Sequence, residues 1–212
     1  MKKFELTDEF VTNVFGHKLF RIKALVAFGD VEKGELGGFI EKEDNLSHDD
    51  NAWVFGDARV SGDARVSGNA RVFGDARVFG DAWVFGDARV FGDARVSGDA
   101  RVSGNAQVFD NAQVFGDARV SGNARVSGNA DYAVVAGFGR YFRTTTFFRC
   151  KDKILRVQCG CFYGDLAQFR EIVKKTHGDS KYAKEYLAIA DLMELHFSDK
   201  CGGEQMNDGK IY

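Results

Sequence analysis

A six-residue pattern of apolar and polar positions runs through the middle of the chain. Valine occupies position 54 and every sixth position up to 126, and alanine stands two residues before each valine. A period of six fits short β-strands joined by turns, whereas an α-helix would need a period of about 3.6. Because successive strand residues point to opposite faces, Ala and Val should face inward and the Arg between them outward. The pattern predicts thirteen short strands between Asn51 and Ala130.

Turn residues separate these predicted strands. Each repeat begins with Gly followed by Asp or Asn, residue types that tolerate turn conformations, and only Asp110 replaces this glycine between repeats. Three hexapeptides would close one triangular coil, so the repeats would wind a little over four coils, roughly 20 Å tall at the spacing of stacked strands. We therefore predict a mainly β protein whose centre, residues 51–130, is a parallel β-helix of about four triangular coils.

The residue after each valine is either Phe or Ser, and this variation has a second period. At a spacing of 18 residues four phenylalanines fall into one column that ends in Ser127, whereas a spacing of 12 mixes Phe and Ser in both columns. The order supports three faces per coil and predicts a contiguous apolar stripe of a size that marks interfaces. The predicted interface residues are the phenylalanine column, Phe55, Phe73, Phe91 and Phe109, together with Phe79 and Phe115.

Two explanations of this stripe are open. The stripe either contacts another subunit or partner, or it is covered by a terminal segment of the same chain. The first explanation predicts a homo-oligomer, a dimer or trimer, or a complex with a protein partner.

The segments on either side of the repeats should cap the coil, because an open solenoid exposes unpaired strand edges. In the N-terminal segment, residues 1–50, apolar side chains alternate with polar ones and predict a strand of a β cap. The alternating apolar positions are Phe20, Ile22, Ala24, Val26 and Phe28.

Residues 131–212 have the pattern of a small α+β domain. The stretch 132–150 is rich in Val, Phe and Thr, which favours β-strands, and a hairpin turn at 151–153 should lead to a returning strand over 154–159. Asp165 can cap a helix over 166–175. A second helix should cover about 180–197, because apolar residues recur there at steps of four and three. Its predicted apolar stripe is Tyr182, Tyr186, Ile189, Met193 and Phe197.

Composition agrees with a folded protein rich in strands. The sequence contains 25 glycines, which supply turns, and no proline, which could not donate to a sheet. The net charge of −2 divides into −4 in residues 1–50, zero in 51–130 and +2 in 131–212, so no bulk charge points to nucleic acid. No apolar run approaches the about 18 residues of a membrane span, and no membrane partner is expected.

The cysteines and the start of the chain bear on location. The first residues contain no apolar segment of signal-peptide length. Cys159 and Cys161 are too close for an ordinary mutual disulfide, and with Cys150 and Cys201 they favour reduced thiols in the cytoplasm. A zinc site of these cysteines would need a better signal than Cys-x-Cys, which lacks the usual spacing, so we predict no metal.

The unit Val-x-Gly-Asp-Ala-x resembles the hexapeptide repeat of left-handed parallel β-helix proteins, a group that includes acyltransferases and γ-class carbonic anhydrases and whose members are often trimers. The resemblance implies left-handed winding. Gly-Glu-Leu-Gly-Gly-Phe-Ile at 34–40 and Asn-Leu-Ser at 45–47 look more specifically like YdcK-like bacterial proteins. Residues 144–197 resemble a small domain of phage-encoded and gut-bacterial repeat proteins, which would place a phage-encoded chain in the host cytoplasm.

These resemblances bring no catalytic residue with them. The acyltransferases use a histidine as general base, and the carbonic anhydrases hold zinc with several histidines. The repeats contain no histidine, and we predict no catalytic residue and no cofactor. The four histidines of the chain, all outside the repeats, are His17, His48, His177 and His196.

The predicted function is therefore a non-enzymatic β-helix scaffold or binding protein that acts through assembly or partner contact. The phage resemblance implies host manipulation or counter-defence. A second hypothesis is an acyltransferase-like enzyme or a binder of acyl-CoA or a nucleotide.

A third hypothesis is nucleic-acid binding through the segment 140–156. Basic and aromatic residues mix in this segment, and such surfaces can stack bases and neutralise phosphates. A strand with aromatic residues inside and cations outside explains the same pattern and is the favoured explanation. The cations, also candidates for contact with a protein partner, are Arg140, Arg143, Arg149, Lys151, Lys153 and Arg156.

Overall fold

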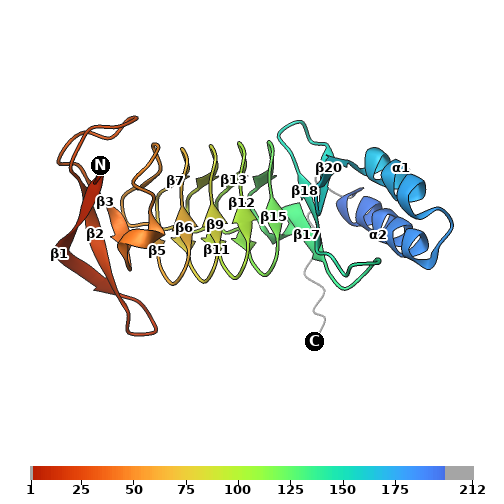
Figure 1. The fold of residues 1–212 in the computed structure, drawn as a ribbon, viewed down its shortest axis with the longest axis horizontal. Helices are drawn as coiled ribbons and strands as arrows, with labels where there is room; N and C mark the ends of the chain where they lie inside the picture. Colours follow the sequence, from red (N-terminus) through yellow and green to blue (C-terminus); the bar gives the residue numbers. More distant parts are fainter. Residues whose placement is uncertain (1, 199–212) are drawn as a thin grey trace, which may run out of the picture.

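The computed structural model describes residues 2–198, which form a rod. Figure 1 shows a central coil of stacked turns, a β-structure at its start, and a sheet with two helices at its end. The coil is a parallel β-solenoid, because each strand pairs in parallel with strands one turn away. The predicted fold class, a mainly β solenoid with an N-terminal β cap and a small α+β C-terminal domain, is confirmed.

The strands of the coil are two residues long, except for the first, which has five. They are β3 (Leu36–Ile40), β4 (Trp53–Val54), β5 (Arg59–Val60), β6 (Arg65–Val66), β7 (Arg71–Val72), β8 (Arg77–Val78), β9 (Trp83–Val84), β10 (Arg89–Val90), β11 (Arg95–Val96), β12 (Arg101–Val102), β13 (Gln107–Val108), β14 (Gln113–Val114), β15 (Arg119–Val120) and β16 (Arg125–Val126). They stack in the orders β3-β5-β8-β11-β14, β6-β9-β12-β15 and β4-β7-β10-β13-β16. Val60 pairs with Val78, 18 residues later, so one turn contains three hexapeptides, as the order of Phe and Ser predicted.

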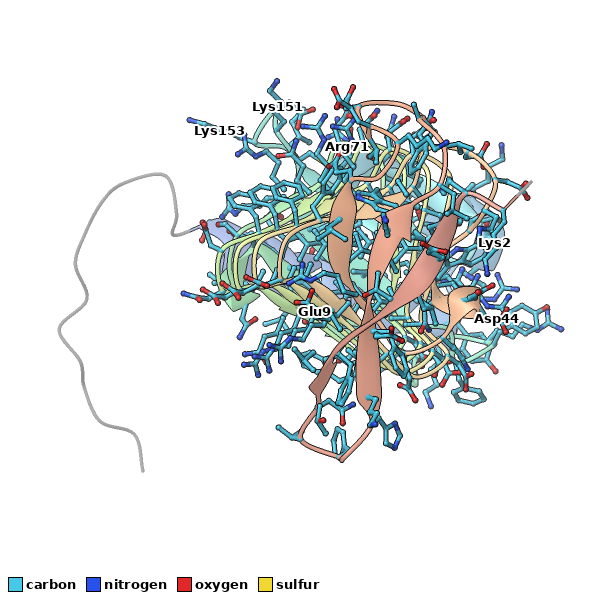
Figure 2. All side chains as sticks on the ribbon, turned by 90° about the vertical axis from the view of Figure 1, so that its left-hand side faces the viewer. Lys2, Glu9, Asp44, Arg71, Lys151 and Lys153 are labelled. Carbon is cyan, nitrogen blue, oxygen red and sulfur yellow. The ribbon has the colours of Figure 1, made fainter. Side chains whose placement is uncertain are left out.

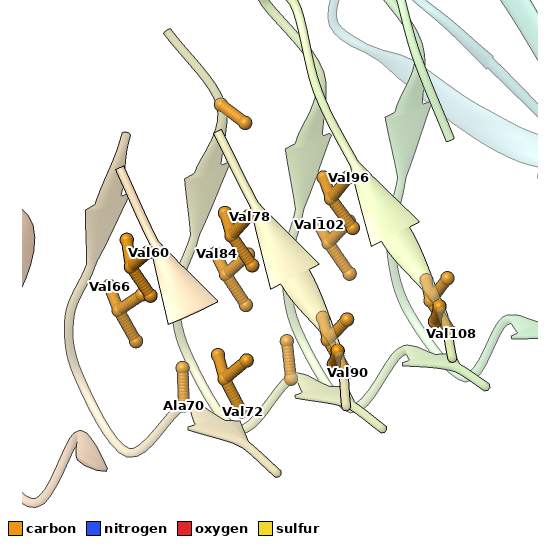
Figure 3. Close-up of a cluster of buried hydrophobic side chains, with 14 of the residues drawn as sticks. Val60, Val66, Ala70, Val72, Val78, Val84, Val90, Val96, Val102 and Val108 are labelled. Carbon is orange, nitrogen blue, oxygen red and sulfur yellow. The ribbon is translucent and has the colours of Figure 1, made fainter. Parts of the chain in front are cut away.

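Alanine and valine fill the interior of the coil. Every Ala and Val at the repeat positions from 52 to 126 is buried. Figure 3 shows some of them, such as Val60, Val78 and Val96, pointing into the space that the sheets enclose. The corners need glycine: Gly68 has a φ of 67°, and a Cβ there would lie 2.9 Å from the backbone nitrogen of Gly86 in the next turn. Asp110, which replaces a corner glycine, adopts the same conformation with a φ of 53°, which Asp tolerates better than most residues.

The first turn of the coil begins before the repeats. Phe39 and Ile40 of β3 pair with β5, and Leu46 bridges to Val66. Each of the three stacks therefore has five layers, and the coil has five turns where the repeats alone predict a little over four. The period of 18 does not reveal this turn, because Ile40 and Leu46 each stand 20 residues before their partners.

A hairpin continues one sheet of the coil at its start. β1 (Phe4–Thr12) pairs antiparallel with β2 (Lys18–Ala24), which pairs with β3. The strand predicted over 20–28 ends at Ala24, so Val26 and Phe28 lie in the following loop. The chain turns there because Phe28 and Val31 form a tight bridge, after which Gly34 N donates to Ala24 O at 2.8 Å.

Aromatic side chains close this end of the coil. Phe4 and Trp53 are fully buried, with 6.2 Å between their ring centres. Phe28, from the loop after β2, packs edge-on against Trp53, with 5.3 Å between the ring centres. Trp53 occupies a position that is outward in the repeats, and the cap turns this position into core.

The opposite end is closed by a four-stranded antiparallel sheet. Its strands, paired in chain order, are β17 (Tyr132–Val135), β18 (Thr145–Arg149), β19 (Leu155–Cys159) and β20 (Phe162–Asp165). One face places Tyr132, Phe148 and Cys150 in the core of the coil. The other face places Phe147 and Val157 against the helices. Alternation along β18 therefore joins two hydrophobic cores through one sheet.

The two helices agree with the predictions. α1 (Leu166–His177) is capped by Asp165, whose Oδ1 accepts from Gln168 N at 2.8 Å, and α2 (Lys181–Ser198) packs against it. Tyr182 of the predicted stripe is 38 % exposed, because it lies in the first turn of α2, edge-on to His177. The buried members of the stripe are Tyr186, Ile189, Met193 and Phe197.

Backbone hydrogen bonds give the coil a direction. The N–H groups of each turn donate to carbonyl groups of the following turn, as Arg59 N does to Ala76 O at 2.9 Å. The last turn would therefore present unpaired N–H groups, which are costly when buried. Side-chain oxygens from the C-terminal end accept on all three sheets at 2.9 to 3.0 Å: Asn129 Oδ1 from Gln113 N, Thr146 Oγ1 from Arg119 N, and Asp131 Oδ2 from Ser127 N.

The first turn presents carbonyl groups instead, and a lysine binds them. Lys3 is 3 % exposed, and its Nζ donates to Ala52 O at 2.9 Å and to Asp50 O at 3.3 Å. Removal from water lowers the pKa of Lys3 to about 8 from its ordinary value of 10.5. The buried ammonium thus completes the carbonyl end of the coil.

This depressed pKa predicts a rise of stability at high pH. Between about 8 and 10.5 the unfolded chain holds a proton on Lys3 that the folded chain has released, so the free energy of unfolding increases with pH in this window. Below pH 8 both states are protonated and the increase is absent. We expect Lys3→Met to remove it, measured by urea unfolding at several pH values from 7 to about 10.5. Lys2→Met, at an exposed neighbour, is the matched control, and an unchanged slope in Lys3→Met would contradict the prediction.

Candidate functional site

The phenylalanine column lies along one corner of the coil. Phe73 and Phe91 stack with 4.8 Å between ring centres and 2° between planes, and Phe91 and Phe109 with 5.1 Å and 9°. Phe55 instead packs against the core at the N-terminal end. The structure therefore brings three of the four predicted rings into one continuous stack. Arg125, where the column ends, lies over the Phe109 ring at 5.2 Å.

Within residues 2–198, the stack stays partly exposed on the side of the coil. Figure 1 shows that the hairpin and the C-terminal domain lie at the two ends of the coil. The loop between β2 and β3 reaches the side of the coil at Arg71, which pairs with Asp30. Each ring is only partly exposed, because the rings cover one another. Among residues 2–198, neither terminal segment therefore seals the stripe completely, and residues 199–212 lie outside the described part of the chain.

The other predicted phenylalanines do not form a stack. Phe79 and Phe115 share a corner with Ser61 and Ser97, so the two rings are separated by a turn that carries Ser. Phe79 is partly exposed, whereas Phe115 is 59 % exposed in the last turn. The apolar surface of the coil is therefore concentrated on the column of Phe73, Phe91 and Phe109.

A groove lies on a different side of the coil, and the predicted site residues did not include it. It has a volume of about 290 Å³ and is open to solvent. Trp83 stands in it at an outward strand position, 38 % exposed. The sequence signal was present, since Trp replaces the usual Arg of the repeat there. The groove is lined by Asp63, Arg65, Asp81, Trp83, Asp99 and Arg101.

The six cations of the 140–156 segment do not form one surface. Arg149 donates to Phe197 O and lies over its ring, while Arg156 pairs with Asp152 at 2.7 Å. Figure 2 shows Lys151 and Lys153 together at the hairpin turn that follows β18. Arg140 and Arg143 belong to the loop that precedes β18, and both lie over the Tyr141 ring, at 5.5 and 5.0 Å. Two cations thus support packing, and the other four are divided between opposite ends of one strand.

The thiols and histidines occupy separate structural positions. Cys150 is buried, which raises the pKa of its thiol, and Cys159 accepts from Thr145 Oγ1 at 3.2 Å. Cys161 is exposed and, within residues 2–198, forms no disulfide. His177 stacks on Tyr186, whose pKa burial raises to about 12. Within residues 2–198, no three His, Cys, Asp or Glu side chains gather as metal ligands; Cys201 lies outside the described residues.

Neither helix in the described part of the chain combines the length and the apolar character that crossing a membrane requires.

Comparison with known families agrees with the architecture of the coil. No curated protein was found to match the chain. A family model, the YdcK β-solenoid repeat, matches six segments of the coil, and consecutive segments among the first four overlap. The matched residues are 52–68, 58–72, 64–78, 70–86, 94–110 and 118–130. The central coil is thus a β-solenoid whose repeats are similar to those of YdcK.

Proposed function

We propose that this protein is a non-enzymatic scaffold whose solenoid assembles with further protein subunits through the column of Phe73, Phe91 and Phe109. The stacked rings carry the proposal, because they form an apolar corner that is partly exposed in the described chain. Contiguous exposed apolar surface on a folded protein marks contact sites. The subunit is a second or third copy of the chain, since closed symmetric homo-oligomers are the commonest assemblies.

The construction of the coil suits a scaffold. Ala and Val side chains fill the interior of the coil, so no room is left inside it for a ligand. Repeated packing of identical layers at protein-core density makes such a rod stiff. A cytoplasmic location is part of the proposal, supported by the free thiols of Cys150, Cys159 and Cys161.

The interface can be tested with the other residue that the repeat itself uses. We expect the wild-type protein to have about two or three times the molar mass of one chain in light scattering. Phe73→Ser with Phe91→Ser should yield monomers, because serine stands after the valine in other turns without disturbing the coil. Loss of the stacked pairs should cost only about 0.5–1.5 kcal/mol each, so circular dichroism should remain that of the folded coil.

Phe79→Ser is the matched control on another corner. It removes a ring of the same type from the same repeat position and should leave the molar mass unchanged. A monomeric wild-type protein, or an oligomer that survives the double substitution, would overturn the proposal.

A foreign protein partner would extend this function rather than replace it. The resemblance of residues 144–197 to a domain of phage-encoded repeat proteins supports a role in host manipulation or counter-defence. In that case, affinity capture from the host should recover one protein with the wild type and lose it with the two Phe→Ser substitutions. Capture that is equal with both proteins would exclude the column as the contact site.

A further inference from the structure

The repeat supplies an internal control for unusual residues. At the outward strand position, eleven of the thirteen repeats carry Arg or Gln, and only positions 53 and 83 carry Trp. Trp53 is fully buried under Phe4 and Phe28, so the N-terminal cap explains it. Trp83 lies on β9 in the middle of its sheet, between Arg65 and Arg101 on the neighbouring strands. Within residues 2–198, its ring and hydrogen-bond contacts come from the coil itself. Its presence needs another reason.

The indole of Trp83 is held in place. Its Nε1 donates to Ser67 Oγ at 3.0 Å, and its ring packs on Phe85 with 4.4 Å between centres and a tilt of 35°. The Arg101 guanidinium lies 5.9 Å from the ring centre. A fixed, partly exposed aromatic ring is a platform that a ligand can use at little entropic cost.

Opposite charges line the groove without pairing across it. Within residues 2–198, four of the charged side chains that line the groove form no ion pair within 4.0 Å: Asp81, Asp99, Arg65 and Arg101. Asp63 pairs with Lys42, which does not line the groove. The groove therefore offers two carboxylate acceptors and two guanidinium donors that face solvent around one indole. A ligand that matches this arrangement must both donate and accept hydrogen bonds beside an apolar face.

We propose that this groove binds a sugar ring of a carbohydrate. The C–H face of the pyranose lies on the part of the Trp83 ring that Phe85 and Arg101 leave exposed. Each hydroxyl group can donate to Asp81 or Asp99 and accept from Arg65 or Arg101, because a hydroxyl has both capacities. The Asp side chains disfavour a phosphate backbone, and the two Arg side chains disfavour a cationic ligand. The groove does not include the phenylalanine column, so the inference goes beyond the proposed assembly.

Saturation-transfer NMR with defined oligosaccharides tests this site. Open, polar grooves bind weakly, so cellohexaose, maltohexaose and chitohexaose are each offered at about 10 mM. We expect transfer from the protein to the ring C–H protons of at least one of them, and an at least tenfold smaller transfer with Trp83→Arg. That substitution restores the common residue of the repeat and should leave the fold intact. No transfer from the wild type to any of the three would overturn the proposal.

Two further measurements separate the groove from simple stacking and from assembly. Trp83→Arg combined with Arg95→Trp moves the indole to an outward position on a neighbouring sheet. If this protein shows wild-type transfer, any exposed indole suffices and the site assignment is wrong. Asp81→Asn with Asp99→Asn should weaken transfer about tenfold, and undiminished transfer would contradict the role of the carboxylates. Trp83→Arg should leave the molar mass in light scattering unchanged, so this result and the test of the phenylalanine column can fail independently.

Discussion

Val90→Asp is expected to destroy the cooperative folding of the coil. Val90 is fully buried on β10, the middle strand of its sheet, with Val72 and Val108 as its neighbours. A carboxylate there would lose its water without gaining any partner. We expect a loss of at least about 4 kcal/mol, a large part of the stability of a typical domain. Urea unfolding followed by circular dichroism should show the loss directly.

Arg89→Asp is the matched control, because it places the same side chain one residue away on the outer face. Arg89 is exposed, and surface substitutions usually change stability by less than about 0.5 kcal/mol. The interior assignment of the repeat would be wrong if both variants unfolded at the same urea concentration. Since each turn rests on its neighbours, the damage from Val90→Asp should spread along the stack rather than stay local.

Asn45→Ala is expected to have the second largest effect, at the first turn of the coil. Asn45, at the end of a short 3₁₀ helix η1 (Glu43–Asn45), is completely buried. Its Nδ2 donates to Gly62 O at 2.9 Å and Ala64 O at 2.8 Å, and its Oδ1 accepts from Lys42 N at 2.9 Å. Alanine would leave these backbone groups unpaired at about 1–3 kcal/mol each. We expect a total loss of about 3–5 kcal/mol in urea unfolding, reduced by any water that enters.

Asn51→Ala provides the control with the same change of side chain. Asn51 is exposed, and its Nδ2 donates only to the exposed Asn69 Oδ1 at 3.1 Å. Water can replace that bond, so the expected loss is below about 1 kcal/mol. Equal losses at the two positions would show that burial at the first turn does not determine the cost.

The sequence predicted the coil because its rules are local and repeated. Alternation in Ala-Arg-Val sets inside and outside, and the corner glycines set the turns, so the same prediction holds thirteen times. The first turn was beyond reach of this reasoning. Ile40 and Leu46 occupy interior positions without the repeat around them, and two additional residues separate each from its partner. Only the strand pairing reveals that they belong to the stack.

Some candidate sites could be predicted from the sequence, and others could not. The stack of Phe73, Phe91 and Phe109 follows directly from the period of 18. The cations of 140–156 had no such period. In the structure, four of them are divided between the two ends of β18, and the other two make contacts within the fold. Trp83 was visible as a departure from the repeat, but its meaning depends on burial. The same departure at Trp53 is core, and the sequence alone treats the two alike.

The three-sided turn makes repeat number a control of angle as well as length. Because each hexapeptide forms one side of the triangle, adding 18 residues should separate the two ends by about 4.8 Å and preserve their relative orientation. Adding six should instead rotate the C-terminal sheet and helices by a third of a revolution about the rod axis, with both closures still intact. Insertion or deletion of single hexapeptides would then change the azimuth between the terminal hairpin and the helical domain in discrete steps.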